Sequence, residues 1–239
     1  LAPTDFAATH NGYVQGKPTD YNRDVALDVT QLLAFLQSTQ PKAVDTLELA
    51  ADGIKRTQFL HRLQGEITKR GVVDVLRKGV SHGPVHVDLY KLLPTPGNAA
   101  AADAFGKNIF SVTRQLRYSN DESQRSLDMV IFINGLPVLT FELKNSLTKQ
   151  TLADAIVQYQ TTRSPQELLF QLGRCVAHIA VDDVEAAFCT ELKGKASWFL
   201  PFNQGWNSGA GNPPNPDGLK TDYLWKQVLT RESLANIIE

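Results

Sequence analysis

The feature that most constrains the fold of this sequence is a pair of apolar runs separated by Asn134-Gly135, within residues 127–145 (LDMVIFINGLPVLTFELKN). An Asn-Gly pair between two such runs is a strong signal for a β-hairpin, because both residues tolerate the positive φ angles of tight turns. The first run carries Asp128 near its start, and the second ends with Glu142 and Lys144. The sequence therefore predicts two paired strands with charged side chains at the end away from the turn.

These charges restrict what the hairpin does. Glu142 and Lys144 are two positions apart and share one face of the strand, whereas Phe141 and Leu143 point to the other face. Charged groups at the end of a mostly buried strand are costly unless they are paired or bind a metal. Two interpretations follow: a salt bridge at the end of the sheet, or a divalent-metal site with a lysine beside it.

The metal site would have the chemistry of a nuclease. Asp128, Glu142 and the backbone carbonyl of Leu143 suit Mg²⁺, which takes few protein ligands and keeps several waters. The metal lowers the pKa of a bound water and neutralises charge that develops on a phosphate. Lys144 would position that water and stabilise the transition state. Spacing alone does not decide the matter, because Glu-x-Lys is a short motif that recurs by chance.

A second Glu-x-Lys segment runs from Glu191 to Lys193. Its lysine begins a Lys-Gly-Lys sequence, which is typical of an exposed turn. We therefore predict that this segment is not a site.

Composition bounds the class of protein. The chain has 239 residues, 42% of them hydrophobic, with a net charge of −1, which is enough for one sizeable core. Near-neutral charge argues against a general nucleic-acid coat but not against a local basic surface. Two cysteines, Cys175 and Cys189, indicate a reduced cytoplasmic protein with buried thiols. No apolar run approaches the roughly 18 residues of a membrane span.

The periodicity along the chain predicts alternating helices and strands. We expect helices at residues 20–40, 57–70, 151–162 and 223–238, and strands at 72–76, 85–90, 108–118, 176–181 and 187–192, in addition to the hairpin. Pro41 would end the first helix, and Thr151 with Asp154 would form a capping box at the third. Trp198 is expected in the core. The predicted fold class is α/β (α+β), with a central mixed sheet flanked by helices.

The register of the hairpin makes a sharper prediction. A plain two-residue turn would set Asp128 opposite Phe141, on the face away from Glu142, and the site would not form. The hairpin must therefore contain a β-bulge or a loop of odd length. A three-residue loop, 133–135, is one solution, and a bulge elsewhere in either strand serves equally.

Four segments resemble a known family: NIFSVTRQLRY, LDMVIFINGLPVLTFELKN, LKGKASWFLPFNQGWNSGAGNPPNP and TDYLWKQVLTRESL. They are similar to the N-terminal nuclease region of the type I restriction endonuclease R subunit. The resemblance implies a restriction-endonuclease-like PD-(D/E)xK fold, with Asp128, Glu142 and Lys144 as its acid, acid and lysine. The family's Gln-x-x-x-Tyr motif matches Gln158, but residue 162 is threonine, and a tyrosine lies instead at Tyr159.

The resemblance also implies a larger assembly. The family's R subunit continues into an ATP-driven translocase, and this chain has no G-x-x-x-x-G-K-[ST] loop, so ATP would bind in a part outside it. We expect residues 1–239 to form a single endonuclease domain, with a core at about 20–200 and a C-terminal loop and helix at 201–239 leading to the translocase. Expected partners are double-stranded DNA and the methyltransferase and specificity subunits, in the cytoplasm of a bacterium or archaeon.

Other residues are weaker candidates. Glu66, on an early helix, is a candidate additional metal ligand, although an exposed helical glutamate is the commoner outcome. Residues near the site are expected to contact DNA phosphates, and the alternative for each is a solvated group on the surface. They are Arg114, Asn145, Lys149 and Arg163.

Two other functions stay open. The first alternative is a different PD-(D/E)xK nuclease, such as a repair or stand-alone restriction enzyme. The second is a non-catalytic docking module of the motor subunit. The complete set of acid, acid and lysine favours an active nuclease, because an idle domain has no reason to keep costly charges at a strand end.

Overall fold

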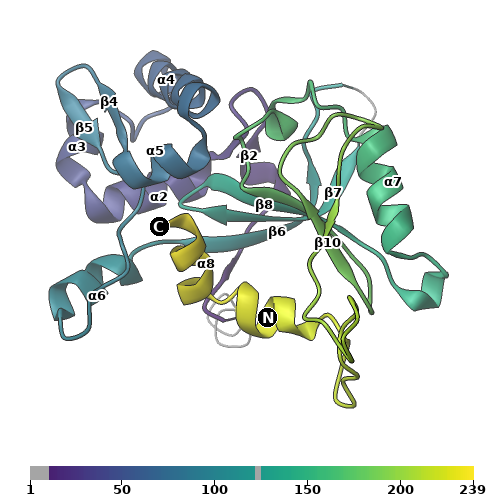
Figure 1. Cartoon of the computed structure of the whole chain (residues 1–239). Coiled ribbons are helices and arrows are strands. Elements are labelled where there is room, and N and C mark those ends of the chain that lie inside the picture. Colours follow the sequence, from purple (N-terminus) through teal and green to yellow (C-terminus); the bar gives the residue numbers. More distant parts are fainter. Residues whose placement is uncertain (1–10, 122–124) are drawn as a thin grey trace.

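The centre of the molecule is a mixed β-sheet with helices on both faces (Figure 1). The computed structural model describes residues 11–121 and 125–239. Within this part, the strands of the main sheet lie in the order β1 (Val14–Gln15), β6 (Phe110–Arg117), β7 (Ser126–Ile133), β8 (Leu136–Leu143), β9 (Ala177–Val181), β10 (Ala186–Cys189) and β11 (Leu200–Pro201). β1 is parallel to β6 and β9 to β8, and the other neighbours are antiparallel. The predicted α/β (α+β) class with a mixed sheet is confirmed.

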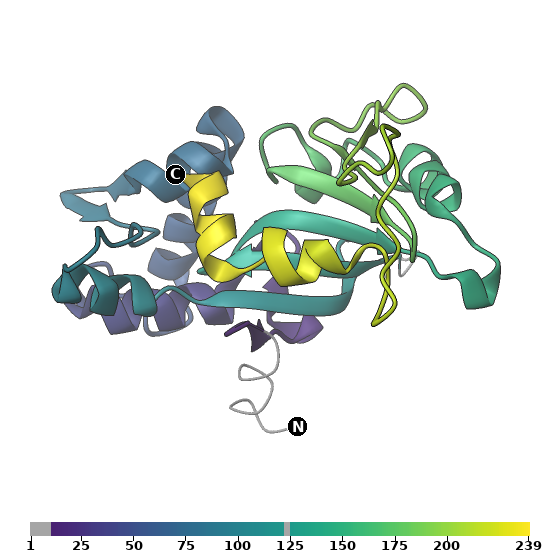
Figure 2. The same ribbon diagram turned by 60° about the horizontal axis from the view of Figure 1, so that its bottom comes forward.

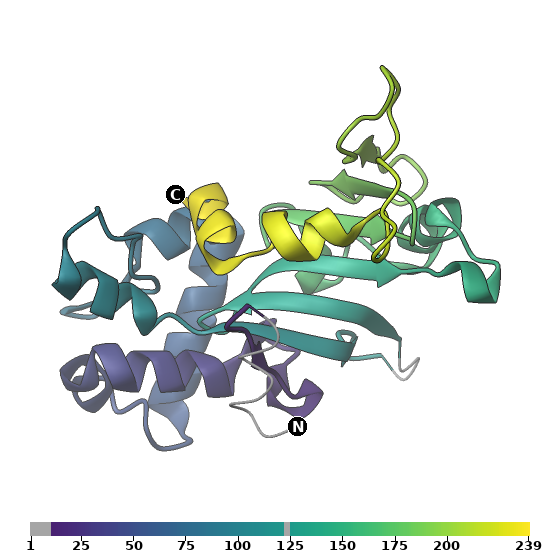
Figure 3. The same ribbon diagram turned by 90° about the horizontal axis from the view of Figure 1, so that it is seen from below.

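The helices divide between two apolar clusters, one on each face of the sheet. The described α-helices are α2 (Val29–Thr39), α3 (Pro41–Thr46), α4 (Ile54–Arg70), α5 (Val72–Lys78), α6 (Ala99–Gly106), α7 (Leu152–Thr162) and α8 (Arg231–Ile238). The larger cluster joins α2, α4, α5 and α8 to the sheet, and the smaller joins α7. Figures 2 and 3 show the C-terminal helices lying across the sheet, with α7 at the end of the molecule away from α4.

Short elements complete the fold. They are the pairs β2 (Tyr21–Asn22) with β3 (Leu27–Asp28) and β4 (Val80–His82) with β5 (Val85–Val87), the 3₁₀ turns η1 (Pro18–Asp20), η2 (Ser146–Thr148) and η3 (Leu168–Phe170), and the π-helical turn η4 (Leu224–Val228).

The hairpin of β7 and β8 contains the predicted irregularity. Ile133 pairs with Leu136, so the turn has two residues and the three-residue loop was wrong. The register then shifts, because Ile131 pairs with Leu139, and Val138 is the extra residue of a β-bulge. Val138 and the adjacent Leu139 consequently lie in the same apolar cluster. The bulge prediction is confirmed.

The Asn-Gly turn is fixed by backbone conformation and burial together. Asn134 and Gly135 have φ angles of 51° and 81°, as a tight hairpin turn requires. A Cβ at Gly135 would lie 2.3 Å from the carbonyl oxygen of Asp28, which only glycine avoids. The buried Asn134 amide donates to the carbonyl oxygen of Leu89 at 2.9 Å, and its oxygen accepts from the Ile109 amide at 2.7 Å. The turn is therefore an anchored part of the core.

The helix predictions are correct where caps are strong. α4 ends at Arg70 as expected, although it begins at Ile54, and the capping box of Thr151 with Asp154 is present in α7. The first predicted helix begins too early: residues 21–28 form β2, a turn and β3. α2 starts at Val29, where the Asp28 carboxylate accepts from the Gln31 amide at 2.9 Å.

Three other predictions were wrong. Residues 72–76 form the start of α5, because Val72, Val75 and Leu76 are buried at helical spacing and β-branched composition did not decide the conformation. The C-terminal helix is interrupted: η4 ends at Val228 and α8 begins after Thr230, whose side chain caps it. Trp198 is 76% exposed and does not belong to the core.

Candidate active site

Two carboxylates lie close together at the end of the β7–β8 hairpin that is away from the turn. Continuing the register beyond the bulge sets Asp128 opposite Glu142. The half-buried Asp128 accepts a hydrogen bond from the Leu143 amide at 2.8 Å, which fixes it against the end of β8. Glu142 is 0% exposed, and burial raises its pKa to about 7, with the Asp128 carboxylate adding to the rise and the Arg163 guanidinium opposing it. The bulge therefore brings together the two acids that the sequence predicted.

The second acid is held from one side only. Arg163, directly after α7, donates from Nε to Oε1 of Glu142 at 2.6 Å. Oε2 of Glu142 is buried, and it has no hydrogen-bond partner in the described part of the chain. A buried carboxylate oxygen without a partner is unusual and costly. It marks a position where a cation would be stabilised.

The predicted lysine lies beside this pair. Lys144 follows β8 and is half-buried, and its Nζ donates to Oε1 of Gln158 on α7 at 2.5 Å. Gln158 is thus in contact with the lysine that the sequence assigned to the nucleophile. α7 supports the second acid through Arg163 and the lysine through Gln158.

These residues fit a hard, oxygen-ligated cation. No group of three or more His, Cys, Asp or Glu side chains suited to a metal occurs among residues 11–121 and 125–239. Mg²⁺ does not need one, since it binds through one or two carboxylates and keeps several waters. Asp128 and the free Oε2 of Glu142 supply that set. The carbonyl of Leu143 remains a predicted third ligand.

Beneath Glu142 lies a buried polar chain that keeps no net charge. The Tyr159 hydroxyl bonds Oγ1 of Thr140 at 2.9 Å, and the same oxygen bonds Nδ1 of His178 at 2.8 Å. Burial lowers the pKa of His178 to about 3 and raises that of Tyr159 well above its ordinary value, so both are neutral. Tyr159 therefore binds α7 to the sheet, while the side-chain hydroxyl of Thr162, at the expected tyrosine position, donates to the carbonyl oxygen of Gln158 within its own helix.

One contact of the site had no sequence signal. Gln115 on β6 has a φ angle of 51°, and its side-chain amide donates to Oδ1 of Asp128 at 3.3 Å. The hydroxyl of Ser126 donates to the Gln115 oxygen at 3.1 Å. Positive φ at a residue other than glycine stores strain, and such strain concentrates at functional sites. An exposed glutamine in an alternating strand gives no such indication from sequence.

Two weaker candidates do not lie where they were expected. Glu66 forms ion pairs with Arg62 and Arg70 at 3.1 and 2.9 Å, and α4, which carries it, lies at the other end of the molecule from α7 (Figure 1). Glu66 therefore pairs with arginines of its own helix and does not reach the site. Arg163 is 5% exposed and bonded to Glu142, so a surface contact with DNA was the wrong role for it.

The other predicted DNA contacts are placed but stay predictions. Arg114 and Lys149 are exposed, and the exposed Asn145 caps η2 by accepting from the Thr148 amide at 3.0 Å. The second Glu-x-Lys segment forms a surface ion pair, with Nζ of Lys193 at 2.7 Å from Oε2 of Glu191.

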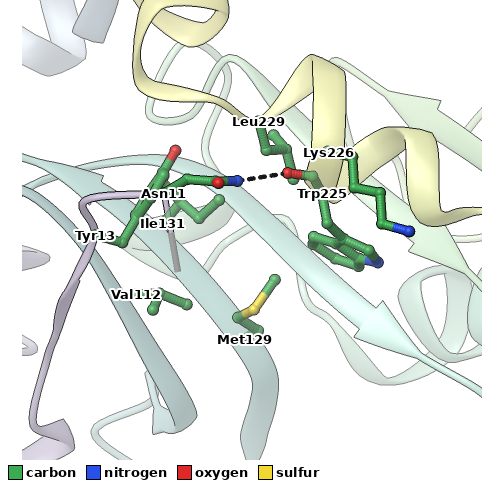
Figure 4. Close-up of a pocket in the computed structure, with 8 residues that line it drawn as sticks. All are labelled: Asn11, Tyr13, Val112, Met129, Ile131, Trp225, Lys226 and Leu229. Carbon is green, nitrogen blue, oxygen red and sulfur yellow. Dashed lines mark hydrogen bonds between the residues drawn. The ribbon is translucent and has the colours of Figure 1, made fainter. Parts of the chain in front are cut away.

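An apolar pocket lies on the other face of the sheet, between β6, β7 and η4 (Figure 4). It has a volume of about 320 Å³, and Met129, Ile131 and Trp225 are among the residues that line it. Met129 neighbours Asp128 in sequence but points to the opposite face, as alternation along a strand requires. The pocket and the carboxylates are therefore separate features.

Comparisons with known proteins give one family. A family model described as "Type I restriction enzyme R protein N terminus" matches residues 16–197, which includes every residue of the site described above. A search of curated proteins gave no match. None of the helices in the described residues is both long and apolar enough to span a membrane.

Proposed function

The chain belongs to the type I restriction enzyme R protein family, as part of its N-terminal region, and from this premise we propose that it is the Mg²⁺-dependent endonuclease domain of the complex. Its reaction would be hydrolysis of phosphodiester bonds in double-stranded DNA. Methyltransferase and specificity subunits would be its partners, ATP would bind to a translocase outside this chain, and the complex would act in the cytoplasm.

The observation that carries this proposal is the bulge at Val138. It turns Glu142 to the face of Asp128 and leaves Oε2 of Glu142 buried without a partner among residues 11–121 and 125–239. A fold that only needed a stable hairpin would gain from a regular ladder with apolar residues at these positions, since a buried acid with an unsatisfied oxygen is destabilising. The cost is consistent with a site that binds a cation, and it argues against a non-catalytic docking module.

Each residue would have a separate role. Asp128 and Glu142 would hold Mg²⁺, which supplies activation of water and neutralisation of phosphate charge when bound. Lys144, held by Gln158, would direct its ammonium group to the attacking water or the phosphate oxygens. The hydrogen bond from the Leu143 amide keeps the Asp128 carboxylate oriented before the metal binds.

Replacement of the acids tests the proposal. In the assembled enzyme, Asp128→Asn and Glu142→Gln should each lower DNA cleavage by about 100-fold or more, because each removes a metal ligand. ATP hydrolysis and DNA binding by the complex should be retained. Glu191→Gln in the second Glu-x-Lys segment is the matched control and should cleave at the normal rate. Full cleavage by either acid variant would refute the proposal.

A further inference from the structure

Arg163 makes more contacts than a partner of Glu142 needs. Its Nη1 donates to the Tyr118 hydroxyl at 3.2 Å, and its Nη2 donates to the Ser126 carbonyl oxygen at 2.8 Å. The guanidinium carbon lies 5.4 Å from the centre of the Tyr118 ring. Together with the bond to Glu142, these contacts join the end of α7 to β7, β8 and the residue that follows β6. The orientation of the guanidinium is therefore fixed before any ligand arrives.

From this geometry we infer that Arg163 is a positioning residue, which holds Oε1 of Glu142 so that Oε2 is presented to the metal ion. The inference rests on the proposed function. Arg163 itself lies behind the carboxylate and is only 5% exposed, so it would not contact the metal or the DNA. Its action is exerted through Glu142.

An opposite role for Arg163 has to be distinguished. A guanidinium this close to a carboxylate also competes with a cation for its charge, and in that role its removal would strengthen metal binding. The arrangement favours positioning, because Arg163 engages a single oxygen of Glu142 and the other is left free. A competing arginine would be expected to take both oxygens, which is the common geometry of arginine with a carboxylate.

The structure supplies a matched control. Arg174 is also buried, at 1% exposure, and it donates to the carbonyl oxygens of Val25 and Gln64. It forms no ion pair with the acids of the described chain. Removing Arg174 therefore reports the loss of a buried guanidinium as such, without any effect on the orientation of Glu142.

Metal binding tests the inference apart from cleavage. Mn²⁺ prefers the same carboxylate and water ligands as Mg²⁺, and its binding to the 239-residue chain is measured by electron paramagnetic resonance. Arg163→Met should weaken Mn²⁺ binding by about 10- to 100-fold, the usual effect of losing a group that orients a metal ligand. Arg163→Lys keeps the charge without the fork and should recover part of the loss. Arg174→Met should bind Mn²⁺ normally, even where it lowers the thermal midpoint.

The outcomes separate the inference from the proposed function. If Asp128→Asn binds Mn²⁺ as well as the unaltered chain, the metal site itself is absent and the proposed function fails. If binding depends on Asp128 but Arg163→Met binds with equal or higher affinity, only the positioning role is overturned. An equal loss in Arg174→Met would also overturn it, because the effect would then be general. Should Arg163→Met fail to fold, Arg163→Lys decides: unchanged affinity opposes the inference and weakened affinity supports it.

Discussion

The two Glu-x-Lys segments of this chain share the same three-residue pattern and have different surroundings. Glu142 is fully buried, and it and Lys144 each bond a separate residue at or following α7. Glu191 and Lys193 bond each other at the surface, with side chains 39% and 57% exposed. In the first segment, the contacts with Gln158 and Arg163 hold the lysine and the acid separately, so the two do not pair with each other. In the second, each satisfies the other. What packs against the motif decides whether it is a candidate site.

The difference originates in the positions of the two segments in the sheet. β8 lies between β7 and β9, so the end of β8 has a neighbour on each side and α7 packed on its face. Glu191 lies beyond the end of β10, whose partner β11 has only two residues. A central strand end can surround a carboxylate, and an exposed turn leaves it in water, where an ion pair contributes little.

The largest expected effect comes from removing the bulge. Deletion of Val138 would restore a regular ladder and turn Glu142 and Thr140 toward the large apolar cluster. Burying an acid there without a partner should cost more than about 4 kcal/mol, enough to abolish a stable fold. Urea unfolding followed by circular dichroism measures it.

The comparison supplies a control for that deletion. Gly194 lies between Lys193 and Lys195 in the exposed turn of the second segment. Its deletion should leave a cooperative unfolding transition, because no buried strand changes its register. A stably folded chain without Val138 would show that the bulge does not set the face of Glu142.

The next effect concerns the two lysines. Lys144→Met should lower cleavage by the assembled enzyme by about 100- to 1,000-fold, as expected for loss of a group that stabilises transition-state charge. Lys193→Met should leave cleavage unchanged, because in the described part of the chain that ammonium bonds its neighbouring acid at the surface. Single-turnover cleavage at saturating Mg²⁺ separates this effect from weaker metal binding. Equal activity of the two variants would remove the distinction between the segments.

The sequence was sufficient for the elements with strong local signals. The Asn134-Gly135 turn, the capping box of Thr151 and the strands β6 to β8 each depend on neighbours in the sequence, and all are present. The need for a bulge was also predictable, because the chemistry required Asp128 and Glu142 on one face. Its position was missed, although Pro137 lies directly before Val138 and a central strand tolerates proline mainly at a bulge.

The features that the sequence analysis missed depend on contacts between residues far apart in the sequence. Arg163 and Glu142 are 21 residues apart, and Gln115 and Asp128 are 13 apart, so no local pattern relates them. Residues 72–76 are rich in valine, yet the buried positions lie at helical spacing against other elements. Burial by tertiary packing outweighs intrinsic preference in such segments. The acids and the lysine could be predicted, and the groups that hold them could not.

The smallest predicted effect is a pH dependence of stability that belongs to the first segment alone. The pKa of Glu142 rises from 4.5 to about 7 on folding, so the native chain binds more protons than the unfolded chain between these values. The stability contributed by this group therefore falls by at most about 3 kcal/mol as pH rises from about 4.5 to about 7, and it is constant above that.

With metal removed by chelator, the free energy of unfolding of the unaltered chain relative to Glu142→Gln should decline across this window. The difference cancels the titration of Asp28 and His178, which is common to both proteins. Glu191→Gln, in the exposed segment, should retain the slope. A difference between the unaltered chain and Glu142→Gln that is flat from pH 4.5 to 7 would mean that Arg163 outweighs burial and keeps Glu142 ionised throughout.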